Sequence, residues 1–297
     1  MPRLSVLLCT RNRPEKVKRA VASILDNTVR DFELIVVDQS TDDRTRVAMQ
    51  SFADPRLRYI GTQTVGLSRS RNLAVRASTS DTLVFTDDDC ICERSWLAAI
   101  LDEFDRDPIL MGVFGRVIPY GGQRENMFCP AVIDSMERRV VDRPVIPAAV
   151  LGGGNNMSFR KEVFGRVGLF LETLGAGTWL RAGEDTELVY RVLSHRMRIA
   201  YSPLPLVHHD NWMSKDEFAT LMQGSILGAT VVFTKFALTT SGPALSYLIR
   251  LAYYILRDRF GAGSVLRGLW PYGIGFVMGF RYLFVSPPKL IRSASGD

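Results

Sequence analysis

The chain has 297 residues, of which 46% are hydrophobic and 23% are charged. This composition is typical of a globular protein and excludes a disordered chain. The length allows one complete α/β domain and an appended region. The net charge of +6 lies in the last part of the chain, because from position 218 onward eight Lys or Arg stand against two Asp. These basic residues are diluted among apolar ones, which argues against a nucleic-acid-binding surface.

Cysteine usage predicts reduced thiols and a cytosolic compartment. The four cysteines, Cys9, Cys90, Cys92 and Cys129, show no CxxC spacing, and Cys90-Ile-Cys92 is too tight for an ordinary zinc knuckle. The apolar run near the N-terminus is short and lacks a small-residue cleavage site. It therefore predicts a first strand rather than a signal peptide.

Strands and helices alternate along the first 210 residues, which predicts a mostly parallel sheet covered by helices on both faces. The expected strands are Leu4–Cys9, Phe32–Val37, Leu57–Ile60, Leu83–Thr86, Met111–Pro119, Met157–Phe159 and Ile199–Ser202. The expected helices are Lys16–Leu25, a segment ending near Phe52, Gly66–Ala77, Trp96–Phe104, Lys161–Val167 and a helix beginning at Glu184. Gly121–Pro147 is expected to form a long excursion.

Two common nucleotide-binding motifs are missing. The first strand-to-helix turn reads CTRNRP and has no glycine, which excludes the GxGxxG fingerprint of a Rossmann dehydrogenase. The glycine run Gly152–Gly154 is followed by Asn155-Asn156 rather than Lys and Ser/Thr, so it is not a P-loop. A nucleotide would have to bind through side chains such as Asp38 and Arg71.

Two acidic motifs are candidates for chemistry. Asp87, Asp88 and Asp89 directly follow a buried strand, at the edge of an α/β sheet where ligands bind. Three adjacent acids repel one another, and a hard divalent cation that also holds substrate phosphates would offset them. The alternative is a solvated acidic turn. The second motif, Glu184-Asp185, starts a helix, and its alternative is a favourable N-terminal turn.

Read in order, SVLLCTRNRP, ELIVVDQS, GLSRSRN, VFTDDDC, GGGNNMSFRKEVF and GEDTELVYRV resemble a family 2 glycosyltransferase with the GT-A fold. The resemblance covers roughly residues 4–210. It implies a catalytic domain over residues 1–215, with a nucleotide-sugar half at about 1–105 and an acceptor half at about 106–215. Residues 216–297 then form a C-terminal helical, amphipathic extension.

The resemblance implies how the donor nucleotide binds. Asp38, which ends the second strand, maps to the acid that contacts the nucleotide base. Arg71 and Asn72 map near the base and diphosphate, and a guanidinium suits phosphate oxygens. Thr10 and Arg11, in the turn after the first strand, belong to the same binding region.

The resemblance also implies a metal and a sugar pocket. The DxD motif maps to Asp87 and Asp89, with Asp89 as the metal contact and Asp88 towards the sugar; Mn²⁺ or Mg²⁺ would neutralise the leaving nucleoside diphosphate. His208 maps to a third metal ligand, although the adjacent His209 leaves this assignment open. The GGGNN run is similar to the acceptor-side wall of the family's sugar pocket. The resemblance therefore implies that this pocket is lined by Gly153, Gly154 and Asn155.

The activity implied is inverting, metal-dependent transfer of a sugar from a UDP-, GDP- or dTDP-linked donor to a glycan or lipid-linked acceptor. Asp185 would be the general base, with Glu184 as the second candidate. Two alternatives stay open: a non-catalytic nucleotide-sugar-binding or membrane-docking module, and a metal-dependent nucleotidyltransferase. The absence of convincing transmembrane helices and of a QxxRW motif argues against a processive polymer synthase.

The tail predicts contact with a membrane. Segments Phe218–Leu238, Ala244–Leu256 and Val265–Val285 are apolar, but Lys and Arg interrupt them before any reaches spanning length. Amphipathic helices on an anionic membrane surface fit this pattern, through about residues 218–290. We therefore expect a cytoplasmic protein held peripherally at the inner face of the cell membrane. The alternative is a helical region that packs on the catalytic domain or forms a homo-oligomer.

Overall fold

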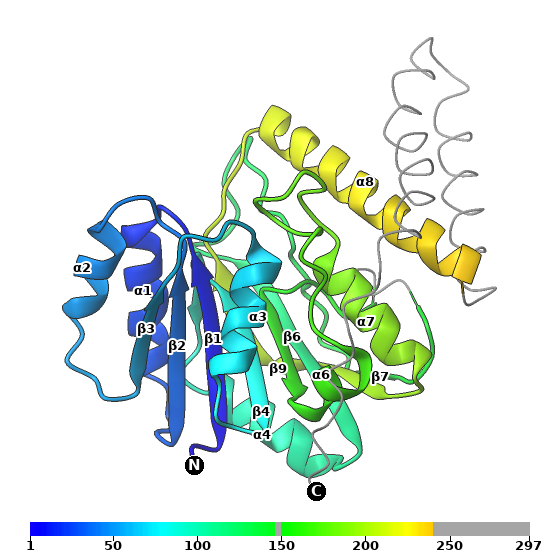
Figure 1. Cartoon of the computed structure of the whole chain (residues 1–297), viewed down its shortest axis with the longest axis horizontal. Coiled ribbons are helices and arrows are strands. Elements are labelled where there is room, and N and C mark those ends of the chain that lie inside the picture. The colour runs from blue at the N-terminus through cyan, green and yellow to red at the C-terminus, as the bar shows by residue number, and fades with distance from the viewer. Residues whose placement is uncertain (146–149, 240–297) are drawn as a thin grey trace, which may run out of the picture.

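The computed structural model describes residues 1–145 and 150–239, and these form a mixed sheet with helices on both faces (Figure 1). The strands are β1 (Leu4–Thr10), β2 (Phe32–Asp38), β3 (Leu57–Gly61), β4 (Thr82–Asp87), β5 (Cys90–Cys92), β6 (Leu110–Pro119), β7 (Arg139–Val141), β8 (Asn156–Arg160) and β9 (Arg198–His209). The helices are α1 (Pro14–Leu25), α2 (Arg44–Gln50), α3 (Leu67–Ala77), α4 (Trp96–Arg106), α6 (Glu162–Val167), α7 (Glu184–Ser194) and α8 (Lys215–Thr239).

The order of the strands is β3-β2-β1-β4-β8-β6-β9-β5, with β7 also paired to β9. β1, β2, β3 and β4 are parallel, as the alternating pattern predicts. β8 runs antiparallel to both β4 and β6, and β5 and β7 run antiparallel to β9. The second half of the sheet is therefore mixed. Antiparallel neighbours need no helical crossover, which is why the long excursion before β8 can lead into the sheet.

Two apolar clusters cover the two faces of the sheet. One contains Val17 and Val21 of α1 and Trp96 of α4, while the other contains Val75 of α3 and Leu188 of α7. The strands β1, β2 and β4 are buried on both faces, which accounts for their nearly continuous apolar sequences. The acids that end β2 and β4 therefore stand at the edge of a rigid layer.

β9 is longer than the sequence predicts. It continues past Ser202 to His209, through Pro203 and Pro205. Its register with β6 shifts between Gly115 and Arg116, opposite these prolines. Proline has no backbone N–H, and such an irregularity lets it sit in a strand without leaving a ladder bond unmade. The extension places His208 and His209 beside β5 and the acidic turn.

Helix α8 packs against the α/β domain. Val231, Val232 and Phe233 form an apolar cluster with Leu180 and Tyr190 of the α7 region. Figure 1 shows α8 crossing beside α7. The part of the tail that falls in α8 thus buries apolar residues against the protein, as the packing alternative predicts. Within the described residues, no helix is both long and apolar enough to cross a bilayer. Segments Ala244–Leu256 and Val265–Val285 lie outside those residues.

Candidate functional site

The acidic run lies where β4 leaves the sheet. Asp87 ends β4 opposite Cys9 of β1, and Asp88 and Asp89 form the turn into β5. Asp88 and Asp89 are 5% and 4% exposed, so they do not form a solvated surface turn. Thr10, at the end of β1, donates its hydroxyl to Asp88 at 2.7 Å. Thr10 and the acidic run are therefore in direct contact, at the same edge of the sheet.

Protein cations partner these acids. Nη1 of Arg13 lies 2.9 Å from Asp88 and 3.0 Å from Asp89, and Nζ of Lys16 lies 3.9 Å from Asp89. Burial raises the pKa of Asp88 to about 6 although Arg13 opposes the rise. The repulsion among the acids is thus offset in part by side chains at the start of α1. The repulsion among the three carboxylates is therefore not by itself an argument for a bound metal.

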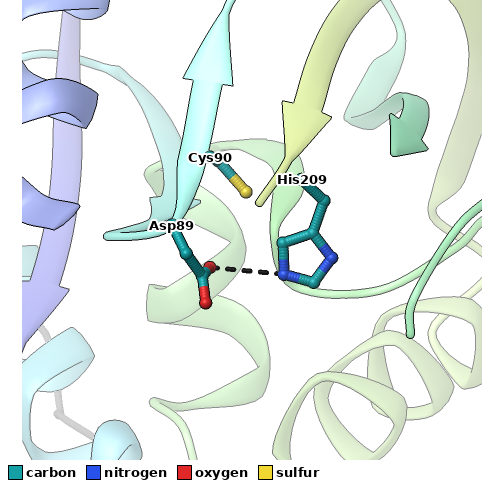
Figure 2. Close-up of side chains that lie close together, drawn as sticks. All are labelled: Asp89, Cys90 and His209. Atoms are coloured by element: carbon teal, nitrogen blue, oxygen red, sulfur yellow. Dashed lines mark ion pairs between the residues drawn. The ribbon is translucent and has the colours of Figure 1, made fainter. Parts of the chain in front are cut away.

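The two histidines at the end of β9 point to different partners. Nε2 of His209 lies 3.3 Å from Oδ1 of Asp89, and both residues are buried (Figure 2). Nε2 of His208 lies 2.7 Å from Glu93 instead. The structure therefore brings His209, not His208, to the acidic run.

The ligand atoms of Asp89, Cys90 and His209 lie within 4.8 Å of one another. Burial disfavours the imidazolium form of His209, but bonding to Asp89 and Cys129 outweighs it and raises the pKa of His209 to about 10. Burial likewise holds the pKa of the Cys90 thiol well above its ordinary value, so Cys90 is a neutral neighbour. Carboxylate and neutral imidazole are a donor pair that suits Mn²⁺, so a metal bound here would displace the proton that His209 shares with Asp89.

Arg71 joins the two acidic motifs. This residue of α3 is 3% exposed, and its guanidinium lies 3.2 Å from Asp87 and 3.0 Å from Glu184. It also donates to the carbonyl of Gly154 at 3.2 Å. A planar guanidinium with several donors can hold three partners in fixed directions. All three of these partners of the Arg71 guanidinium are groups of the protein itself.

Asp185 is held at the start of α7. Gly183 precedes the helix with a φ of +96°, a conformation that favours glycine. Oδ2 of Asp185 accepts the N–H of Gly154 at 2.8 Å, and Oδ1 accepts the N–H of Thr186 at 2.6 Å. These two bonds fix the direction of the carboxylate. Glu184 beside it is 6% exposed, and burial raises its pKa to about 7, with Asp185 adding to the rise and Arg71 opposing it.

The remaining predicted residues lie around the acidic run and Glu184-Asp185. Asp38 ends β2 beside Thr10 and accepts bonds from Tyr59 and from the N–H of Ser40, each at 2.8 Å. Asn72 is buried and exchanges two bonds with the backbone of Phe170, so its amide holds the loop after α6.

Arg11 is exposed on the turn that follows β1. Gly153 lies next to Asp185, and Gly154 lies next to Arg71. The following residue, Asn155, is buried. Among the predicted residues, Asn72, His208 and Asp38 form their side-chain hydrogen bonds with groups other than the acidic run and Glu184-Asp185.

Sequence reasoning missed Arg13 and Lys16. Arg13 is the residue just before α1 and Lys16 lies in its first turn, three residues further on, and both side chains reach the acids. Side chains at i and i+3 share a helix face, so the spacing after CTRN was a usable signal. Tyr59, which donates to Asp38, had no such signal, because its contact depends on the pairing of β2 with β3.

The acidic residues at the ends of β2 and β4 lie at the edge of an α/β sheet, and comparison with known proteins identifies the class. Residues 5–167 match the family model described as Glycosyl transferase family 2, and the chain belongs to this family. The expected resemblance and the expected fold are thereby confirmed. The match spans the acidic run and the glycine run, and ends before Glu184-Asp185.

Similar proteins carry related names. The chain is 24% identical over 230 residues to a glucosyl-dolichyl phosphate glucuronosyltransferase of Haloferax volcanii, covering 74% of this chain and 73% of that protein. It is 26% identical over 191 residues to an uncharacterized glycosyltransferase of Haemophilus influenzae, covering 64% of this chain and 62% of the relative. It is 31% identical over 93 residues to a GalNAc(5)-diNAcBac-PP-undecaprenol beta-1,3-glucosyltransferase of Campylobacter jejuni, covering 30% of each.

Solved structures share the fold. Residues 1–349 of TarS from S. aureus superpose with a TM-score of 0.59 at 15% identity, covering 82% of this chain and 67% of that one. A complex of the same protein with UDP-GlcNAc gives a TM-score of 0.58 at 14% identity, covering 81% and 76%. At this identity the likeness concerns the fold.

Proposed function

We propose that this chain transfers a sugar from a nucleoside-diphosphate sugar to an acceptor hydroxyl with inversion at the anomeric carbon. The observation that carries the proposal is the fixed carboxylate of Asp185, which lies next to Gly153 and Gly154 of the glycine run. In a single displacement, the acceptor oxygen attacks the anomeric carbon and the bond from that carbon to the diphosphate oxygen breaks. Asp185 takes the acceptor proton, and the nucleoside diphosphate leaves with the electron pair.

The donor would lie along the ends of β1, β2 and β4. Asp38 is the proposed contact of the base, and Thr10, Arg11 and Asp88 would line the ribose and the sugar. For the diphosphate we propose Arg13 and Lys16, whose side chains are 47% and 37% exposed and already reach the acidic turn. Arg71 and Asn72 would support the site through protein contacts rather than touch phosphate.

A divalent cation fits the donor atoms at this edge. Asp89 and His209 would hold Mn²⁺ or Mg²⁺, and Asp87 stands next to them with a pKa raised by burial despite Arg71. When bound, the cation would neutralise the leaving diphosphate. This proposal replaces His208 with His209, because His208 is committed to Glu93.

The relatives support a UDP-linked donor and a lipid-linked acceptor. TarS structures are described with UDP and UDP-GlcNAc, and two relatives are named for dolichyl phosphate and undecaprenol substrates. The basic, apolar tail favours peripheral contact with the cytoplasmic face of an anionic membrane, where such acceptors reside. Pelleting of the full chain with vesicles containing phosphatidylglycerol, but not with phosphatidylcholine vesicles, tests this contact.

The transferase proposal is tested by ligand binding and by one variant. UDP, GDP, dTDP and CDP are compared by thermal shift, each with and without Mn²⁺, because a ligand of the native state raises Tm. We expect one diphosphate to stabilise the protein, with Mn²⁺ increasing the shift. Asp185→Asn should bind that diphosphate normally and lose about 100-fold or more in transfer. Near-normal transfer by Asp185→Asn would exclude it as the base, and release of pyrophosphate would favour a nucleotidyltransferase.

A further inference from the structure

Arg19 and Arg124 meet at one carboxylate beside the acidic turn. Nη1 of Arg19 lies 2.7 Å from Oδ2 of Asp210, and Nη2 of Arg124 lies 3.6 Å from Oδ1 of the same residue. Arg19 belongs to α1, Arg124 to the excursion between β6 and β7, and Asp210 directly follows β9. The carboxylate is 17% exposed, whereas the two arginine side chains are 45% and 50% exposed. The acid is therefore mostly covered, while both guanidiniums stay open to solvent.

Aromatic rings hold both guanidiniums in place. The guanidinium carbon of Arg19 lies 4.9 Å from the centre of the Tyr120 ring, and that of Arg124 lies 4.8 Å from the centre of the Trp212 ring. A cation over an aromatic face is attracted to it, and the planar guanidinium keeps N–H donors around its edge. Each arginine is thus restrained by a ring and by Asp210 before any ligand arrives. Such preorganisation lowers the entropy that binding would cost.

Positive charge is in excess around these two arginines, which we call the Arg19–Arg124 cluster. Nζ of Lys16 donates to the carbonyl of Asp210 at 2.9 Å, so three cations border a single carboxylate. Lys16 also approaches Asp89, at 3.9 Å. Within residues 1–145 and 150–239, Asp210 is the only acid at ion-pair distance from either guanidinium. An anion brought between the arginines would therefore meet an attraction that the protein's own acids do not cancel.

The Arg19–Arg124 cluster lies apart from the proposed contacts of the donor diphosphate. Arg13, Lys16 and Arg19 follow one another at intervals of three residues, so they succeed one another along one side of α1. Arg13 reaches the acidic turn, Lys16 lies between, and Arg19 reaches Asp210. Six helical residues rise about 9 Å, so Arg19 stands well beyond Arg13. A diphosphate held by Arg13 and Lys16 therefore does not account for Arg19 and Arg124.

We propose that the Arg19–Arg124 cluster binds a phosphate group, at a site separate from that of the donor diphosphate. A phosphate presents three oxygens, enough to accept N–H groups from both guanidiniums while Asp210 keeps the arginines in place. The phosphate can be part of a lipid-linked acceptor, the headgroup of an anionic lipid or free phosphate, and the experiments separate these sources. Binding at the cluster does not depend on the transfer reaction, but its assignment to an acceptor rests on the proposed function.

Inorganic phosphate is the first probe, titrated at constant ionic strength and followed by calorimetry. Arg19→Gln and Arg124→Gln should each bind phosphate about tenfold more weakly than the wild type, because each removes one forked donor. Lys18→Gln is the matched control, since it removes the same charge from an exposed position of α1 and should leave the affinity unchanged. Arg13→Gln, at the proposed donor site, should retain this binding. Wild-type affinity in both cluster variants, or a loss in Arg13→Gln alone, would overturn the proposal.

Asp210→Asn separates a ligand site from a purely structural set of ion pairs. It removes the one negative charge between the guanidiniums, so phosphate should bind at least about threefold more tightly than in the wild type. Arginines that served only to hold the excursion against α1 and β9 would give no such gain. Phosphate affinity that falls in Asp210→Asn as far as in the arginine variants would mean that all three changes disturb local structure, and would overturn the proposal.

Two further probes identify the carrier of the phosphate. Farnesyl phosphate represents a phosphorylated isoprenoid lipid, with farnesol as its phosphate-free control, and phosphatidylglycerol vesicles represent an anionic membrane surface. If the acceptor carries the phosphate, the wild type should bind farnesyl phosphate more tightly than inorganic phosphate, and Arg19→Gln/Arg124→Gln should lose this binding at least about tenfold. If a headgroup carries it, the double variant should instead pellet less with the vesicles. Binding of inorganic phosphate alone would assign the site to free phosphate.

The phosphate site can fail independently of the transferase proposal. A folded wild type that binds no nucleoside diphosphate overturns the proposed function, yet its titration with inorganic phosphate still decides whether the cluster is a site. A wild type that binds a nucleoside diphosphate, but equals Arg19→Gln/Arg124→Gln with inorganic phosphate, farnesyl phosphate and vesicles, overturns this inference alone. A loss in the arginine variants together with a gain in Asp210→Asn supports it, because a structural role would not give opposite signs.

Discussion

Nη1 of Arg71 lies 3.0 Å from Oε1 of Glu184, although 113 positions separate the two residues in the chain. The pair is buried, with side chains 3% and 9% exposed. Arg71 also reaches Asp87 at the end of β4. One guanidinium therefore connects the acid at the end of β4 with the helix that carries the proposed base.

Removal of Arg71 should destabilise the fold. Arg71→Met would leave the buried carboxyl groups of Asp87 and Glu184 without their cation, and breaking such a pair costs about 3–5 kcal/mol. Urea unfolding measures this loss. Arg44→Met is the control, because Arg44 pairs with Asp42 on the exposed surface, where solvent screens an ion pair and its loss should change stability little. Equal, small losses in the two variants would contradict the connecting role of Arg71.

Gly154 should be intolerant of a methyl group. A Cβ atom at this position would lie 2.7 Å from Nη2 and 2.8 Å from Nη1 of Arg71. Because the guanidinium is held by two carboxylates, Gly154→Ala should cost about 1–3 kcal/mol and reduce transfer. At Gly153 the same atom meets nothing closer than 3.6 Å, so Gly153→Ala should fold as stably as the wild type. Thermal unfolding of the two variants side by side is the measurement.

Glu184 should make stability depend on pH. Burial raises its folded pKa from the ordinary value of 4.5 to about 7, so between these values the folded state binds more protons than the unfolded state. Stability contributed by this group therefore falls as pH rises from about 4.5 to 7 and then levels. Glu184→Gln cannot ionise, and the difference in unfolding free energy between variant and wild type should grow in favour of the variant over that window. A constant difference from pH 5 to pH 8 would refute the raised pKa.

The sequence predicted most of the sheet because its central strands are buried on both faces and read as continuous apolar runs. It also predicted Asp87–Asp89, Glu184 and Asp185, whose positions follow from where a strand ends or a helix begins. It did not predict β5 or β7, each three residues long, nor the antiparallel direction of β8. Strands this short carry too little periodicity to be recognised.

The partners of the acids could not be read from the sequence in the same way. Whether His208 or His209 faces Asp89 depends on the register of β5 with β9, and a shift of one residue exchanges the two. That register depends in turn on the irregularity at Pro203 and Pro205. The sequence analysis placed Arg71 near the diphosphate and did not predict its ion pair with Glu184. That contact is made only by tertiary packing.

The two histidines should differ in metal binding. His209→Gln removes the imidazole beside Asp89, and we expect Mn²⁺ affinity in the presence of the bound diphosphate to fall at least about tenfold. His208→Gln loses the contacts with Glu93 and with the ring of Tyr120 at the partly exposed edge and should bind Mn²⁺ normally. Electron paramagnetic resonance of free Mn²⁺ measures both affinities directly. A larger loss for His208→Gln would return the metal ligand to that residue.

Close packing of Gly228 in α8 against the start of α7 should help to position the proposed base, Asp185. A Cβ atom on Gly228 would lie 2.5 Å from the carbonyl oxygen of Ala182, the residue before the turn that starts α7. Because a backbone atom cannot rotate away, Gly228→Ala must move α8 or the Ala182–Gly183 turn, at a cost of about 1–3 kcal/mol. Asp185 follows that turn, so transfer should decrease beyond the loss of folded protein.

Gly224, one turn earlier on α8, gives the matched control. A Cβ atom there would meet Arg181 at 3.8 Å, an ordinary contact, and alanine favours a helix by about 1 kcal/mol over glycine. Gly224→Ala should therefore be as stable as the wild type or more so, with unchanged kcat. If Gly228→Ala lowered stability but left kcat of the folded fraction intact, α8 would support the fold without positioning Asp185.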